Sequence, residues 1–95
     1  MTQTVQTIST SAIPTLNRQF RFQWEPAQNG YDLLYPEGMV QLNPSAGEIL
    51  ALVDGKQSVE DIIVKLRSKF PEAGDISADI LEFLEEAYEQ HWITL

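Results

Sequence analysis

Hydrophobic and polar residues alternate in three short runs in the first half of the chain. In the first run, Phe20, Phe22 and Trp24 fall on one face while the intervening polar residues fall on the other. Turn residues separate the runs: Asn29-Gly30 follows the first, and Tyr35-Pro36-Glu37-Gly38 carries Pro and Gly at positions that a type I turn prefers. The pattern predicts three strands in an antiparallel meander, at residues 20–24, 31–35 and 39–42.

After the third run the spacing of apolar residues changes from two to about 3.6, which predicts a helix. Asn43 can cap this helix with Pro44 at its first position, or Ser45 and Glu48 can form a capping box instead. The helix should end at Asp54-Gly55, where glycine can adopt the left-handed conformation that closes a helix.

Two further helices are predicted after this point. Ser58 can cap the first of them, whose apolar residues fill a face about 100° wide. The other begins around Asp75, and its apolar arc of about 160° is wider than one buried face requires. Either this helix is central and packs on two sides, or one edge of it, formed by Leu81, Leu84 and Tyr88, lines a groove that a partner fills.

The organisation of the chain is that of one small domain. Residues 1–14 are rich in Thr, Gln and Ser and lack periodicity, which predicts a flexible N-terminal tail. Residues 15–95 should form a single α+β domain, a three-stranded antiparallel meander followed by three helices, in a winged-helix-like order. The chain has no run of membrane-spanning length and no secretory signal at its N-terminus. We therefore expect a cytoplasmic protein that does not enter membranes.

The distribution of charge argues against nucleic acid as a partner. The formal net charge is −8, and the segment after Pro71 holds seven acidic residues and no Lys or Arg. A winged-helix regulator of DNA would need a basic recognition helix, and phosphates would repel this last segment. We expect no nucleic-acid partner, although a DNA-binding regulator is the alternative of a different class.

The chain offers few residues for catalysis or metal binding. It has one histidine, His91, and no cysteine, and its five glycines occur singly, so no phosphate-binding loop is present. The acidic residues of the last helix have the spacing of a solvated face. We expect no catalytic site, no metal site, no cofactor and no enzymatic activity.

The third predicted strand has an unprotected edge. Residues 38–42 contain no charge and no proline, the features that normally prevent an edge strand from pairing with another chain. This edge could therefore accept a strand from a foreign peptide. A second copy of the chain, forming a homodimer, or a terminal segment of the same chain could equally cover it.

The sequence also resembles a known family. The stretches "RFQWE", "YPEGMVQLN" and "SAGEIL", followed by Asp54-Gly55, Phe70-Pro71 and a final "FLEEAYEQHWI", occur in the order and spacing of the PqqD family. The resemblance covers residues 18–93. Proteins of this family are peptide chaperones of pyrroloquinoline quinone (PQQ) biosynthesis and represent the RiPP recognition element, a winged-helix-like domain that binds the leader of a ribosomally made precursor.

The resemblance implies a function and a site. The precursor peptide PqqA would add as a strand beside the third strand, in a groove walled by the third helix, and would be presented to the radical SAM enzyme PqqE, which crosslinks a Glu and a Tyr of the precursor. A recognition domain of another modified-peptide pathway is the closest alternative. The positions implied for peptide binding are Met39, Val40, Gln41, Leu42, Ile80, Leu81, Leu84 and Tyr88.

Overall fold

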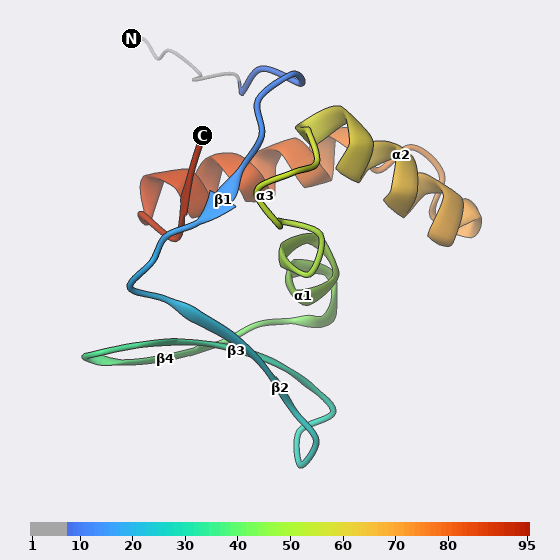
Figure 1. Cartoon of the computed structure of the whole chain (residues 1–95). Coiled ribbons are helices and arrows are strands. Elements are labelled where there is room, and N and C mark those ends of the chain that lie inside the picture. The colour runs from blue at the N-terminus through green and yellow to red at the C-terminus, as the bar shows by residue number, and fades with distance from the viewer. Residues whose placement is uncertain (1–7) are drawn as a thin grey trace, which may run out of the picture.

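The computed structural model describes residues 8–95 and contains the predicted three strands followed by three helices (Figure 1). A short strand precedes the meander and another follows the last helix, and neither was predicted. The elements are β1 (Thr15–Leu16), β2 (Arg21–Glu25), β3 (Gly30–Tyr35), β4 (Gly38–Gln41), α1 (Pro44–Leu50), α2 (Val59–Lys69), the 3-10 turn η1 (Pro71–Ala73), α3 (Ser77–Glu89) and β5 (Ile93–Thr94).

The predicted antiparallel meander is confirmed, with strand order β2-β3-β4. Phe22 pairs with Leu33, and Leu33 pairs with Val40, so these three residues form one row across the sheet and share a face. Leu33 is fully buried on this inner face. Helix α1 covers the inner face and lies between the meander and the other two helices (Figure 1).

The helix starts follow from their capping residues. Asn43 caps α1, since its side-chain oxygen accepts a hydrogen bond from the Ala46 N–H at 2.8 Å, with Pro44 in the first turn. The alternative box between Ser45 and Glu48 is not the cap of this helix. α1 ends at Leu50, before the predicted Asp54-Gly55 stop, and a turn continues from it.

Helix α2 begins as predicted, with a capping box in which Ser58 and Asp61 satisfy each other's backbone N–H groups. Helix α3 begins at Ser77, two residues later than predicted. The Asp75 carboxylate accepts bonds from the Ser77 N–H at 3.0 Å and the Ser77 hydroxyl at 2.7 Å, and this turn precedes the helix.

A second sheet joins the two ends of the domain. Strands β1 and β5 are antiparallel, with Thr15 opposite Thr94 and Leu16 opposite Ile93. The chain beyond β1 is also held, because the Asn17 N–H donates to the Trp92 carbonyl at 2.8 Å. These two-residue strands are too short to show a hydrophobic period, so the sequence pattern did not predict them.

Residues 8–14 do not behave as the predicted tail, whose first seven residues lie outside the described part of the chain. Ile8 is buried in the core, with 3% of its surface exposed. The carbonyl groups of Thr10 and Ala12 accept hydrogen bonds from the Glu60 and Val59 N–H groups, both at 2.9 Å. The first N–H groups of a helix have no partner within it, so α2 holds this segment in place.

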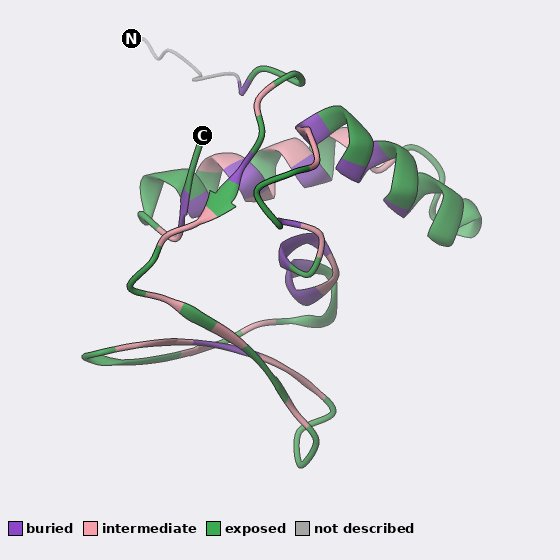
Figure 2. Ribbon diagram, in the orientation of Figure 1, coloured by how far each residue is buried: buried purple, intermediate pink, exposed green. Residues whose placement is uncertain are grey.

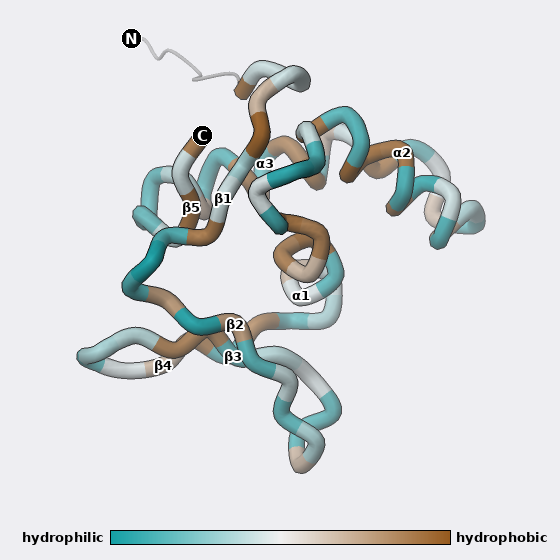
Figure 3. The backbone as a smooth tube through the Cα atoms, viewed as in Figure 1, coloured by the Kyte–Doolittle hydropathy of each residue, from teal (hydrophilic) through white to brown (hydrophobic). Residues whose placement is uncertain are grey.

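The core lies where the three helices meet. Buried residues line the facing sides of α1, α2 and α3, whereas much of the meander is half-buried or exposed (Figure 2). Hydrophobic positions occur on all three helices and also along the meander (Figure 3). Ile80, Leu84 and Ala87 of α3 are buried, as expected for a central helix. No helix within residues 8–95 is long and apolar enough to cross a membrane.

Candidate functional site

The outer edge of β4 has no strand partner among residues 8–95. β4 pairs with β3 on one side, and the short sheet formed by β1 and β5 is separate from the meander. Residues 8–14 pack against the start of α2 and not against β4. The described part of the chain therefore leaves this edge available for backbone hydrogen bonding.

The register of the hairpin fixes which groups face outward. The Leu42 N–H donates to the Tyr31 carbonyl at 3.0 Å, directly beyond the paired residues Asp32 and Gln41. In an antiparallel ladder, residues alternate between those that bond to the neighbouring strand and those that do not. Val40 therefore bonds to β3, while the N–H and C=O groups of Met39 and Gln41 point away from it.

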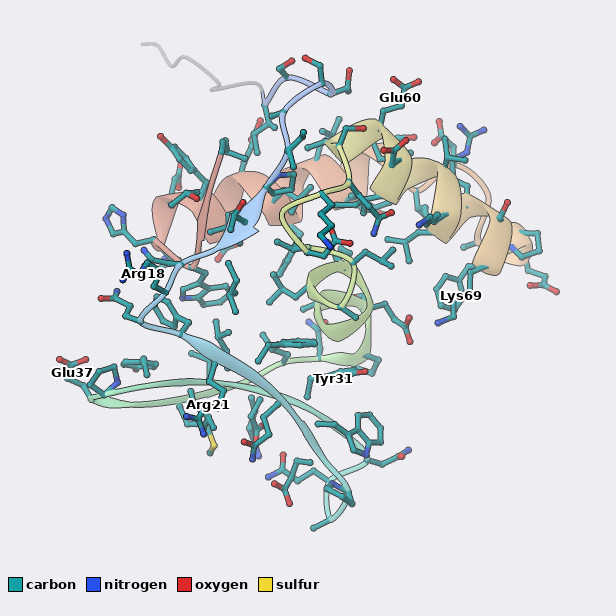
Figure 4. All side chains as sticks on the ribbon, in the orientation of Figure 1. Arg18, Arg21, Tyr31, Glu37, Glu60 and Lys69 are labelled. Atoms are coloured by element: carbon teal, nitrogen blue, oxygen red, sulfur yellow. The ribbon has the colours of Figure 1, made fainter. Side chains whose placement is uncertain are left out.

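Side chains alternate across the same strand. Val40 and Leu42 are half-buried and lie on the inner face, which α1 covers. Met39 is 49% exposed, and Gln41 is also exposed, on the opposite face. Figure 4 shows Arg21 on this outer face and Tyr31 on the side of α1. The Gln41 side chain donates to the Gln28 amide oxygen at 2.8 Å.

The four α3 residues proposed for the groove wall lie in different environments. Leu84 is fully buried and Ile80 is 2% exposed, so both are core residues. Leu81 is half-buried, and Tyr88 is 44% exposed. Leu84 therefore has no surface that could wall an open groove in this structure. Peptide contact by the other three stays a prediction.

An apolar cavity of about 510 Å³ lies beside the start of α1, directly after β4 in the chain. The end of α2 and the first half of α3 complete its wall, and Ile80 is the one predicted wall residue that lines it. The other large apolar side chains that line the cavity are Ile49, Leu66, Phe70, Ile76 and Phe83. Ile76 and Phe83 belong to the wide apolar arc of α3, but periodicity alone could not separate them from Leu84.

A salt bridge lies at the border of this cavity. The Lys69 ammonium group extends from the end of α2 toward α1 (Figure 4) and is 2.7 Å from the Glu48 carboxylate. The same ammonium lies 5.6 Å from the centre of the Phe70 ring. Both charged side chains are partly exposed, so water screens the pair.

A second hollow, of about 530 Å³, lies at the end of the meander near the β2–β3 hairpin. Trp24 and Tyr31 supply its aromatic surface, with ring centres 5.0 Å apart and an edge-to-face angle of 71°. Asn43, Pro44 and Glu48 border both this hollow and the apolar cavity. The two depressions therefore adjoin each other at the junction between β4 and α1.

The two carboxyl groups with a clearly shifted pKa line neither of these depressions. Backbone N–H groups of Lys56 and Gln57 lower the pKa of Asp54, and the Ser77 hydroxyl and N–H lower the pKa of Asp75. Both carboxylates stabilise turns next to helices. Within residues 8–95, no three His, Asp or Glu side chains are grouped so that they could hold a metal ion.

Both the sequence and the fold of this chain are similar to those of known proteins. The family described as "Coenzyme PQQ synthesis protein D (PqqD)" matches residues 31–93. A "PqqA binding protein" of Pseudomonas paraeruginosa is 59% identical over 87 residues, covering 92% of this chain and 95% of the relative. The protein of the same name from Azotobacter vinelandii is 60% identical over 83 residues, covering 87% and 90%.

A solved structure is similar over nearly the same length. It is the solution NMR structure of the PqqD truncation of Methylobacterium extorquens PqqCD, described as a functional and stand-alone RiPP recognition element. The TM-score is 0.73 at 31% sequence identity, and the match covers 92% of this chain and 94% of the other.

Proposed function

Because the chain belongs to the PqqD family, we propose that it binds the PqqA precursor peptide and serves as a recognition element in PQQ biosynthesis. It is a peptide-binding chaperone and not an enzyme. The observation that carries the proposal is the free edge of β4, with its outward-facing backbone groups at Met39 and Gln41, next to an apolar cavity.

The precursor adds to this edge as a fourth strand. Its backbone bonds to the outward groups of Met39 and Gln41, and its side chains alternate between the two faces of the sheet. Those on the inner face lie on the side of Val40 and Leu42 and reach the cavity bordered by Ile80. Backbone bonds provide affinity for any extended peptide, and the cavity selects sequences with an apolar residue at the right position.

Binding also serves a second protein. We propose that the chain presents the bound precursor to the radical SAM enzyme PqqE, which carries out the chemistry. A precursor that is unstructured in solution loses conformational entropy when it orders on the sheet, and this offsets part of the binding energy. Once it is bound, a complex with PqqE raises the local concentration of precursor at the enzyme.

The direct test replaces Gln41, whose N–H points outward, with proline. Gln41→Pro removes one donor to the peptide without breaking the β3–β4 ladder, so the dissociation constant for PqqA should rise about fivefold, the value of one hydrogen bond. Gln41→Ala is the matched control, since it keeps the N–H and should bind nearly normally. Isothermal titration calorimetry measures both affinities, and thermal melting confirms that both variants are folded.

Val40→Pro provides the contrast on the same strand. Its N–H faces β3, so proline there should lower the melting temperature, whereas Gln41→Pro should leave it close to the wild-type value. If a folded Gln41→Pro variant binds PqqA as tightly as Gln41→Ala does, the peptide does not use this edge. Amide chemical-shift mapping with PqqA should then locate the true surface.

A further inference from the structure

The second hollow, which adjoins the start of α1, is lined by residues that favour a positively charged ligand. Trp24 is 47% exposed at its wall, an unusual state for so large an aromatic side chain. Glu48 is the one charged side chain among its lining residues, so the lining contains no Lys or Arg. The amide groups of Asn29 and Gln28 supply further oxygen acceptors around it, the Gln28 oxygen already accepting one bond from the Gln41 amide. The Asn43 oxygen is occupied, because it accepts from the Ala46 N–H and the Ser45 hydroxyl.

These groups match the chemistry of a cationic side chain. An exposed indole face attracts an ammonium or guanidinium group through the ring quadrupole. A carboxylate nearby adds charge attraction, and amide oxygens accept the remaining N–H groups of the cation. An acidic ligand would meet the Glu48 carboxylate, because the Lys69 ammonium that pairs with Glu48 does not line the hollow.

We propose that this hollow binds a Lys or Arg side chain of the peptide that occupies the β4 edge. The proposal rests on the proposed function, because the hollow begins where β4 ends, at Gln41, Leu42 and Asn43. A peptide strand paired with β4 continues past this end. Its next residues then lie beside the hollow, within reach of a long, flexible basic side chain.

Glu48 takes part through an exchange of partners. In the free protein its carboxylate is paired with Lys69 at 2.7 Å, on the side of the apolar cavity. Glu48 also borders the hollow, so a cation arriving with the peptide competes with Lys69 for the same carboxylate. The Lys69 side chain is 60% exposed and can return to water when it is displaced. Lys69 therefore opposes binding of the peptide cation, and Glu48 favours it.

Two substitutions at this salt bridge separate a binding role from a structural one. Glu48→Gln and Lys69→Gln both break the same pair, so a purely structural effect would be equal in the two variants. If Glu48 binds the peptide cation, Glu48→Gln should raise the dissociation constant for PqqA about threefold, as for a partly exposed ion pair. Lys69→Gln should leave that constant unchanged or lower it. Calorimetric titration at low salt gives both values.

Two substitutions test whether the aromatic ring of Trp24 contributes to binding of the cation. Trp24→Leu keeps an apolar side chain but removes the π system, and should weaken PqqA binding about threefold to fivefold. Trp24→Phe keeps an aromatic face and should restore most of the affinity. Melting curves verify that both variants are folded.

The peptide side of the contact completes the test. Each Lys and Arg of PqqA is replaced by Gln in turn, and one replacement should weaken binding to the wild-type protein and have no further effect on Glu48→Gln. Equal losses in Glu48→Gln and Lys69→Gln, or the absence of any such peptide position, would overturn the cation site. The strand proposal survives that result if Gln41→Pro still weakens binding. If wild-type protein does not bind PqqA, both proposals fail.

Discussion

The Tyr31 side chain projects from β3 toward α1, and its neighbours leave its ring little freedom. The Phe22 ring stacks on it, with centres 4.3 Å apart and planes 15° from parallel. On the other side, a Cβ atom built at Gly47 of α1 would lie 2.8 Å from the Tyr31 ring carbon Cδ2. Glycine at this helix position therefore serves close packing of α1 on the meander, at a cost in helix propensity.

Gly47→Ala should destabilise the protein. Alanine gains about 1 kcal/mol in helix propensity. Overpacking against Tyr31 costs about 1–3 kcal/mol and should exceed that gain. We expect a net loss of about 1 kcal/mol in the free energy of unfolding, measured by urea denaturation. Gly30→Ala is the control, because its added Cβ meets no atom closer than 3.8 Å. A Gly47→Ala variant more stable than wild type would show that Tyr31 moves aside freely.

Only some residues of the proposed peptide-binding site could be predicted from the sequence. Met39 and Gln41 carry the outward backbone groups, as the pattern of the third strand allowed, although the register required the structure. Leu84 was placed in the groove because it lies in the wide apolar arc of α3, yet it is buried. Periodicity gives a direction around one helix, and packing against other elements decides which part of that arc stays open.

The segment before β1 acts as part of the helical layer. The Thr10 and Ala12 carbonyl groups accept bonds from the first turn of α2, and Ile8 belongs to the core cluster that contains residues of all three helices. This element escaped prediction because its polar composition resembles that of a mobile terminus. Its order comes from the unpaired N–H groups of α2, which lie almost fifty residues further along the chain.

Ile8→Ala should reveal this contribution to stability. Removing a buried isoleucine side chain costs about 2–4 kcal/mol, so the melting temperature should fall clearly. Ile13→Ala is the matched control, since Ile13 belongs to the same segment but is 46% exposed, and its melting temperature should change little. Equal melting temperatures for the two variants would mean that the segment is not packed in solution.

The longer elements were predictable because each repeats its hydrophobic period over several residues. The meander and all three helices follow from alternation, turn residues and caps, and Asn43 and Ser58 begin their helices as expected. Strands β1 and β5 contain two residues each, and their pairing joins positions 15 and 94. Such a contact depends on the tertiary fold and leaves no local pattern.

At the scale of the whole molecule, the proposed binding surface draws on β4, α1 and α3, which fold together before any peptide arrives. We expect wild-type protein to increase the rate at which PqqE modifies PqqA when the peptide is dilute. Gln41→Pro should lose most of this increase, and Gln41→Ala should retain it. Mass spectrometry of the modified peptide measures the rates. An increase that does not depend on Gln41 would separate stimulation of the enzyme from strand binding.

Both ends of the described chain lie beside the helices and away from the meander: residues 8–14 bond to the start of α2, and β5 pairs with β1 (Figure 1). A domain with this geometry can be joined to another protein at either end, or inserted into a loop, without stretching its fold. The β4 edge belongs to the other sheet, so such a fusion leaves it uncovered by the junction itself. Modularity of this kind lets a recognition domain change its covalent neighbours while its peptide-binding surface stays the same.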